Sequence, residues 1–243
     1  MRHWIIGVLI GAAVWNTGCN PPFTTAPSVS ITPEGQVRQA QAGIAAAERG
    51  NALLRLVNAD PGESSGVMIL RDDKELFSRV PYKSVSAYVE TPKGRNVIEL
   101  RSGEGTEKLS ASHRELVPGR HYTLVALPKE KGGTRLSVFR DDLGLLEAGE
   151  TTVRLINATA DVDDLDLFVA GARHHLLHGI DAGTATTTSF AEMEAGTVEI
   201  RSPNRPTPTL VARFPVEADR FYTFIVTGSA RALDVVQIID RTQ

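Results

Sequence analysis

Short alternating runs of apolar and polar residues fill the chain after Gly50. Ile98 and Leu100 would face one way while Glu99 and Arg101 face the other, which is the two-residue period of a half-buried β-strand. Gly, Pro, Asp and Asn separate these runs, and no helical period of useful length follows Gly50. The pattern therefore predicts an all-β architecture.

The runs recur in the same order at offsets of 99 or 100 residues. The matching segments are 54–59 with 153–158, 94–102 with 196–202, and 120–125 with 220–225. Such self-similarity indicates a tandem duplication. Each copy holds about seven strand-like runs, the number expected of an immunoglobulin-like domain. We therefore predict two tandem immunoglobulin-like antiparallel β-sandwiches, over residues 51–145 and 150–243.

Two different segments precede the first sandwich. Residues 19–33 are rich in proline, which favours an extended tether of about 3.1 Å per residue. Thr32-Pro33-Glu34 is typical of a helix start, because an N-cap candidate is followed by proline at the first helical position. Gly50 is typical of a helix end, so the pattern predicts a short helix over residues 34–50.

The beginning of the chain is typical of an export signal. Met1-Arg2-His3 is a positive start, and the apolar run Trp4–Trp15 is too short to span roughly 30 Å of hydrocarbon. This predicts a signal peptide over residues 1–18. Thr17-Gly18-Cys19 resembles the end of a bacterial lipobox, although Asn16 stands where that motif prefers leucine. The alternative is a plain secretory signal with an incidental cysteine.

Composition sharpens this interpretation. Among 243 residues Cys19 is the single cysteine, so the chain cannot build a disulfide framework. A lipidated Cys19 would leave the mature chain without thiols, and two or three acyl chains would anchor it stably. We expect an exported, membrane-anchored lipoprotein. Asn20, which is not the aspartate associated with inner-membrane retention, favours the outer membrane, at its periplasmic face or the cell surface.

The order of the repeated motifs resembles one known family. A Leu-Arg-Leu-Val-Asn-Ala strand, an Asp-rich turn, a Gly-led strand ending in Glu-x-Arg and a Tyr-Thr strand are similar to the bacterial family catalogued as domain of unknown function 4397. The resemblance covers residues 52–142 and 151–241. Asn58 and Asn157 stand where family members often have histidine, and only the second copy has the Asp-x-Asp strand entry, at residues 164–166. The resemblance implies a fold and an exported location but no reaction.

Four residues are assigned structural roles. Tyr122 and Tyr222 each follow a turn, where a tyrosine can hydrogen-bond back to the preceding corner of an immunoglobulin-like sandwich. The alternative is a plain core tyrosine, which is structural as well. Asn58 and Asn157 close the first strand of each copy.

The sequence offers weak candidates for chemistry. Asp161, Asp163, Asp164 and Asp166 could offer oxygens to calcium, but the segment lacks the glycine and distal glutamate of an EF-hand loop. The histidines of segment 174–178 are expected in a polar inter-strand segment, since His174 and His178 would converge only on a helix.

Catalytic motifs are equally weak. No Gly-x-Ser-x-Gly motif occurs in the sequence. Glu99 and Glu199 occupy equivalent positions in both copies, which favours an architectural role, because a catalytic residue rarely needs preserving twice. We expect neither a metal nor any other cofactor.

These observations predict a non-catalytic, lipid-anchored protein of the cell envelope whose domains mediate binding or structural interactions. Its partners would be the membrane, through the anchor, and an envelope protein or a glycan. Scattered charges and a pI near 6.1 exclude a nucleic-acid footprint. The alternative is a glycan- or calcium-binding surface module. An enzyme comes third, and carboxylates converging in a cleft between the sandwiches would favour it.

Overall fold

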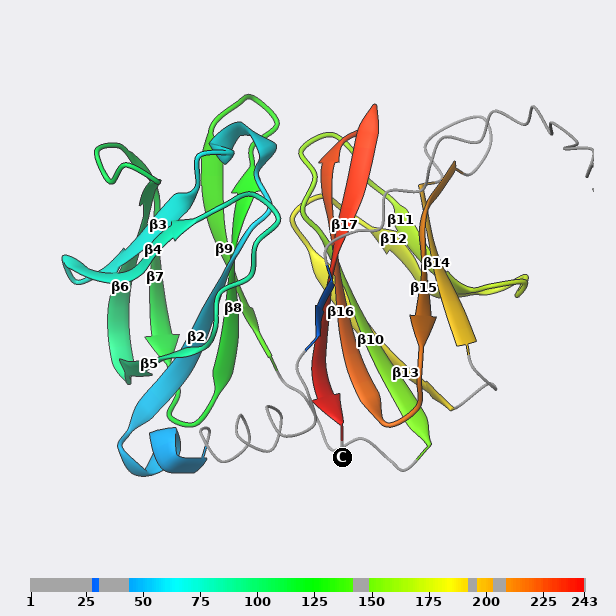
Figure 1. Cartoon of the computed structure of the whole chain (residues 1–243), viewed down its shortest axis with the longest axis horizontal. Helices are drawn as coiled ribbons and strands as arrows, with labels where there is room; N and C mark the ends of the chain where they lie inside the picture. The colour runs from blue at the N-terminus through cyan, green and yellow to red at the C-terminus, as the bar shows by residue number, and fades with distance from the viewer. Residues whose placement is uncertain (1–27, 31–43, 142–148, 192–195, 203–208, 243) are drawn as a thin grey trace, which may run out of the picture.

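The computed structural model describes residues 28–30, 44–141, 149–191, 196–202 and 209–242. The strands of the first copy are β2 (Asn51–Asn58), β3 (Val67–Arg71), β4 (Lys74–Val80), β5 (Val89–Pro92), β6 (Gly94–Ser102), β7 (Lys108–Leu116), β8 (His121–Pro128) and β9 (Thr134–Arg140). Those of the second are β10 (Glu150–Asn157), β11 (Leu165–Val169), β12 (His175–Ile180), β13 (Ala185–Ala191), β14 (Gly196–Ser202), β15 (Thr209–Val216), β16 (Arg220–Ser229) and β17 (Ala232–Thr242). Each copy forms its own sandwich, named sandwich 1 and sandwich 2 (Figure 1). The predicted all-β fold of two tandem sandwiches is confirmed.

Both sandwiches have the same strand order. In sandwich 1 the sheets are β5-β2-β8-β9 and β4-β3-β6-β7, and in sandwich 2 they are β13-β10-β16-β17 and β12-β11-β14-β15. Lettered A to H along the chain, both copies therefore pair D-A-G-H with C-B-E-F. Strand A runs parallel to G and antiparallel to D. This order differs from the A-B-E-D and C-F-G sheets of immunoglobulin constant domains, because the first strand lies in the middle of its sheet.

The central place of the first strand matches its composition. Leu54 and Leu56 of β2 lie in the core of sandwich 1, while Val57 on the opposite face packs elsewhere. A strand buried on both faces reads as a nearly continuous apolar run. The outer sheet instead keeps the predicted alternation, since Ile98 and Leu100 of β6 are fully buried in the same core.

Part of the N-terminal region is described. Residues 44–48 are helical and fall inside the predicted helix, whose residues 34–43 lie outside the described residues. Within the predicted tether, β1 (Ser28–Ser30) pairs in parallel with residues 237–239 of β17. The predicted signal peptide and Cys19 also lie outside the described residues. In the part of the chain that the structure describes, no helix has the length and apolarity needed to cross a membrane.

The two D-A-G-H sheets face each other across the junction between the sandwiches (Figure 1). Their facing surfaces form one apolar cluster that draws on both copies. Its buried members are Val57, Ala59, Val125 and Leu127 of sandwich 1 and Ile156, Ala158, Ile225, Val236 and Ile238 of sandwich 2. The sandwiches are therefore joined by a shared core rather than only by the connecting chain.

Two arginines lie buried beside this cluster, and each crosses to the other sandwich. Arg55 of β2 forms an ion pair with Asp240 of β17, and both side chains are 1% exposed. Arg154 of β10 pairs with Asp141, which follows β9, at 2.7 Å between Nη1 and Oδ1. Residue 55 is equivalent to residue 154, and 141 to 240, so the two ion pairs are reciprocal, as across a two-fold axis.

Two threonines complete the arrangement. Thr123 accepts a bond from Arg55 Nε at 2.8 Å and donates to Asp141, also at 2.8 Å. Its equivalent in sandwich 2, Thr223, accepts from Arg154 Nε at 3.2 Å and donates to Asp240 at 3.0 Å. The name reciprocal arginine network is used below for Arg55, Arg154, Thr123, Thr223, Asp141 and Asp240.

Removing one arginine of the network leaves a buried carboxylate without its partner. We predict that Arg55→Met lowers the free energy of unfolding by about 3–5 kcal/mol, because the buried Asp240 loses its cationic partner. Chemical denaturation measures the loss. Arg49→Ala is the control, since Arg49 pairs with Glu90 on the exposed surface, and it should leave the stability unchanged. A loss no larger than that of the control would contradict the role of the network.

The network also predicts acid lability. Burial alone would raise the pKa of Asp141, but the charges of Arg154 and Arg55 outweigh it and hold this pKa below its usual value. A lowered carboxylate pKa stabilises the fold above about pH 3.9, the unfolded value, and this stabilisation is lost as pH falls further toward the folded pKa.

We therefore expect the stability of the native chain to fall more steeply below about pH 4 than that of Asp141→Asn. Denaturation at stepped pH measures both slopes. In addition, ¹³C NMR of the native chain should find the Asp141 carboxyl still ionised at about pH 3.9, where unfolded aspartates are half protonated. Equal slopes, or an Asp141 that titrates at the usual pH, would contradict the lowered pKa.

Candidate functional site

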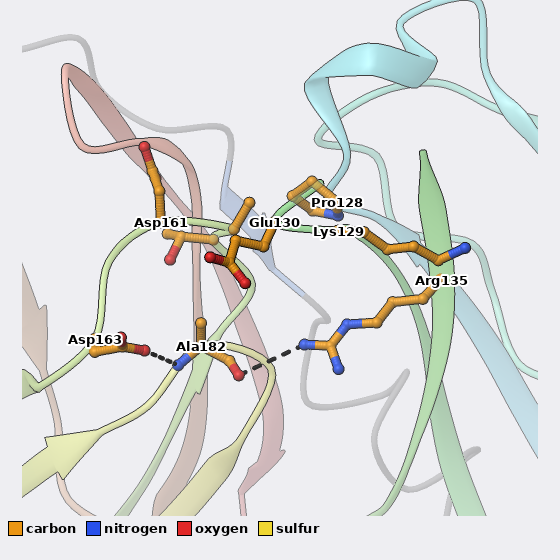
Figure 2. Close-up of a pocket in the computed structure, with 9 residues that line it drawn as sticks. Pro128, Lys129, Glu130, Arg135, Asp161, Asp163 and Ala182 are labelled. Carbon is orange, nitrogen blue, oxygen red and sulfur yellow. Dashed lines mark hydrogen bonds between the residues drawn. The ribbon is translucent and has the colours of Figure 1, made fainter. Parts of the chain in front are cut away.

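A cleft of about 620 Å³ opens at the junction of the two sandwiches (Figure 2). It is lined by Pro128, Lys129, Glu130 and Arg135 of sandwich 1 and by Thr159, Ala160, Asp161, Asp163 and Ala182 of sandwich 2. Its volume falls in the range of about 300–1,000 Å³ typical of small-molecule sites. Because both sandwiches supply its walls, the cleft exists only while the junction is intact.

The wall from sandwich 1 is the hairpin that joins β8 to β9. Residues 129–133 form its loop, closed by a bond from Lys129 N to Gly133 O at 2.8 Å. Gly132 and Gly133 have positive φ angles of 87° and 81°, which glycine adopts without strain. The loop carries the exposed side chains of Lys129 and Glu130, and Arg135 follows on β9.

The wall from sandwich 2 is fixed by the buried amide of Asn157. Its Nδ2 donates to the carbonyls of Val162 at 2.7 Å and Ile180 at 2.8 Å, which ties the β10–β11 loop to the end of β12. Two carboxylates add further bonds to this wall. Asp161 accepts the Ala230 N–H at 3.0 Å, and Asp163 accepts the Ala182 N–H at 3.1 Å.

Charge is divided across the cleft. In Figure 2 Glu130, Asp161 and Asp163 lie to the left, the Arg135 guanidinium reaches the middle beside Ala182, and the Lys129 ammonium lies farther to the right. Arg135 Nη2 donates to the carbonyl of Ala182 at 3.5 Å, a long hydrogen bond. Neither aromatic nor large aliphatic side chains appear among the nine lining residues. The cleft is therefore polar and carries both signs of charge.

The four predicted aspartates do not converge on one point. Asp161 and Asp163 line the cleft, as described above. Asp164 has a positive φ of 55° in the loop that precedes β11. Asp166 accepts from Gly179 N at 3.0 Å and lies 2.8 Å from His178 Nδ1, on sandwich 2. In the described ranges, no group of three or more His, Cys, Asp or Glu side chains is placed to hold a metal ion.

The histidine segment differs from the expectation of an inter-strand connection. Residues 175–180 form β12, and the rings of His175 and His178 stack with their centroids 4.5 Å apart. Residues three apart on a regular strand face opposite ways. The register of β12 against β11 shifts twice, which brings both histidines to one side. A bulge of this kind leaves no signal in the apolar pattern.

Both copies place their structural residues in the same way. Tyr122 Oη accepts the Val117 N–H at 3.1 Å, and Tyr222 Oη accepts the Glu217 N–H at 2.9 Å. Each is the bond of a tyrosine corner. Asn58 donates to the carbonyls of residues 63 and 80 at 3.0 and 3.1 Å, as Asn157 does in sandwich 2.

Glu99 and Glu199 form ion pairs on the outer faces of their sandwiches. Glu199 contacts Arg201 and, at 2.8 Å, Arg213. Hydrogen bonding to Arg201 lowers the pKa of Glu199, and hydrogen bonding to Lys108 lowers that of Glu99. Both carboxylates lie outside the cleft.

Sequence reasoning missed Arg135 and the reciprocal arginine network. A signal for the network was present, because Arg55 and Arg154 interrupt apolar strands at equivalent positions. An arginine in a strand buried on both faces needs a buried partner. No comparable signal marks Arg135, since its surroundings come from a loop of the other copy.

Fold and cleft together define a class, that of tandem β-sandwich proteins whose two domains share one core. The family model described as "Domain of unknown function (DUF4397)" matches residues 52–168 and 151–243. The chain belongs to this family, in two copies, which confirms the resemblance seen in the sequence. No curated protein matches the chain.

Solved structures share low similarity with the chain. The family CBM26 module CBMbc of Eubacterium rectale Amy13K, solved with maltoheptaose, is 10% identical over 76% of this chain and 95% of its own, with a TM-score of 0.24. A candidate cell adhesion protein from Bacteroides uniformis is 8% identical over 80% and 100%, with a TM-score of 0.27. The tip fimbrial protein Mfa3 from Porphyromonas gingivalis is 6% identical over 78% and 98%, with a TM-score of 0.25. At these TM-scores the likenesses carry no inference about function.

The side-chain amide of Asn157 should keep the β10–β11 loop, which forms part of the cleft wall from sandwich 2, well ordered. We predict that Asn157→Ala lowers the free energy of unfolding by about 1–3 kcal/mol, since two buried carbonyls lose their donor. Hydrogen exchange should accelerate over residues 158–164. Asn58→Ala is the matched control, and it should accelerate exchange over residues 59–66 instead. Equal exchange in both loops for both variants would contradict a local role for the amide.

Proposed function

We propose that this chain is a non-catalytic, lipid-anchored protein of the cell envelope that binds a partner at the cleft between its sandwiches. The observation that carries the proposal is the cleft itself, whose two walls come from domains locked together by a shared core. Such a site is preorganised, which lowers the entropic cost of binding. The partner would be an envelope protein or a glycan.

Binding fits the cleft better than catalysis does. Glu130, Asp161 and Asp163 line it, the arrangement that would favour an enzyme. However, Asp161 and Asp163 each accept a main-chain N–H and so hold loops in place. None of the nine lining residues is a serine, cysteine or histidine that could act as nucleophile or base in acyl transfer. These contacts support a binding role.

The anchor is proposed from the sequence. Thr17-Gly18-Cys19 follows a short apolar run, and lipidation of Cys19 would give the only cysteine a chemical role. Acyl chains contribute about 0.8 kcal/mol per buried methylene, so two or three hold a protein at the membrane. Strand β1 begins nine residues after Cys19, which would keep the sandwiches within about 30 Å of the bilayer.

Metabolic labelling with palmitate and membrane fractionation test the anchor in a bacterial host. We expect the native chain to be labelled and membrane-bound, and Cys19→Ala to lose both properties. Asn16→Leu, which restores the preferred residue of the motif, is the matched control and should be labelled at least as well as the native chain. An unlabelled native chain, or a membrane-bound Cys19→Ala, would show the anchor to be wrong.

A further inference from the structure

The duplication gives the cleft a counterpart on the other side of the junction. The turn 81–84 of sandwich 1 is equivalent to the turn 181–184 of sandwich 2. Lys83 N donates to Asn58 O at 2.8 Å, and Gly183 N donates to Asn157 O at 2.7 Å. The hairpins also correspond, because Leu127 pairs with Arg135 just as Thr227 pairs with Asp234.

The counterpart is filled by side chains. Lys83 forms an ion pair with Asp234 of the opposite sandwich. The Lys83 ammonium also lies 5.4 Å from the centre of the Tyr82 ring, and Tyr82 Oη is 3.4 Å from Thr227 Oγ1. On this side of the junction, therefore, a carboxylate from the hairpin meets an ammonium from the turn, and each has its partner.

The cleft is built from the equivalent turn and hairpin, but the side chains that form the ion pair in the counterpart are replaced. Where the counterpart has Tyr82 and Lys83, the cleft has Ala182 and Gly183, and where the counterpart has Asp234, it has Arg135. A Cβ on Gly183 would lie 1.7 Å from Arg135 Nη2, so a larger residue at this position would push the guanidinium aside. The φ of Gly183 is +79°, and the equivalent Lys83 also has a positive φ, of 63°, so the two turns share one backbone conformation.

This exchange leaves Arg135 with unused donors. A guanidinium offers five N–H donors, and Arg135 donates one of them, in a long hydrogen bond, to the carbonyl of Ala182. Within the described residues, no carboxylate lies at ion-pair distance from Arg135. Arginine recognises planar anions through paired N–H groups, so the missing partner has the chemistry of a carboxylate.

The opposite side of the cleft calls for a cation. Glu130 and Asp161 line the cleft on the side to the left of the Arg135 guanidinium (Figure 2). With no aromatic ring in the lining to stack on a sugar, charge is what the cleft can recognise. We propose that the cleft binds a small zwitterion, a short peptide with free ends, whose carboxylate contacts Arg135 and whose ammonium contacts Glu130 and Asp161.

The proposal deepens the proposed function by naming peptide rather than glycan as the ligand class of the same cleft, and it rests on that function only for the cleft being the binding site. Isothermal titration of the full mature chain with tri-alanine tests it. We expect saturable binding that falls at least about tenfold when either end of the peptide is blocked, by acetylation or amidation, since each charged hydrogen bond contributes about that much. Maltoheptaose and calcium chloride should not bind at the cleft.

Three variants locate the binding. Arg135→Ala should weaken tri-alanine binding at least about tenfold. The triple variant Arg135→Asp/Ala182→Tyr/Gly183→Lys, which transfers the residues of the filled counterpart, should abolish it. Lys83→Ala is the matched control on the other side of the junction and should bind as the native chain does. Thermal unfolding of each variant establishes whether it folds. Arg135→Ala tests the proposal even if the triple variant fails to fold.

The outcomes separate the two proposals. Absence of tri-alanine binding, or equal binding of the blocked peptides, overturns the zwitterion. Binding of inorganic phosphate that equals that of tri-alanine also overturns it, in favour of a simple anion site. A photocrosslinker at position 131, an exposed position of the same hairpin loop, reports on the cleft independently. If it captures an envelope component that Arg135→Ala loses while tri-alanine fails, the ligand class is wrong and the binding cleft stands. If both fail, the cleft is not the binding site.

Discussion

The arrangement of the whole molecule depends on two guanidinium groups buried between the sandwiches. Arg55 and Arg154 are withdrawn from water, which costs several kcal/mol each unless every donor finds a partner. Their partners, Asp240 and Asp141, belong to the opposite sandwich. Both ion pairs form only in one relative position of the two D-A-G-H sheets, because sliding one sheet over the other would separate each guanidinium from its carboxylate.

The apolar cluster and the reciprocal arginine network contribute differently to the junction. Burial of residues such as Val57, Ile156 and Ile225 supplies attraction, but this attraction is non-directional and tolerates many packings. The network adds direction, since a buried ion pair contributes little net stability over an apolar pair but makes wrong arrangements costly. Together they hold the hairpin of sandwich 1 and the loops of sandwich 2 at the separation that leaves the cleft open.

Much of the fold was predictable from local pattern. The alternation around Ile98 and the offset of about 100 residues are sufficient for two β-sandwiches, since both follow from the pleat of a strand and from gene duplication. The strand order was not predictable, because it depends on contacts between segments that are distant in sequence. The stacking of His175 on His178 was not predictable for a related reason, because it depends on register shifts between β11 and β12. The cleft could not be predicted from the sequence, because Arg135 and Gly183 come together only when the two sandwiches pack against each other.

Duplication explains how such a cleft can arise at all. In a symmetric dimer of one domain, every substitution appears on both sides of the axis, so the two sides of the junction remain alike. Fusion of the copies removes this constraint while the axis itself stays fixed by the reciprocal arginine network. Positions away from the axis can then diverge separately. Lys83 and Asp234 close one side with an ion pair, and Gly183 and Arg135 leave the other side open with a guanidinium exposed to it. The asymmetry therefore resides in side chains that the common core does not need, which is where a binding specificity can change without loss of the fold.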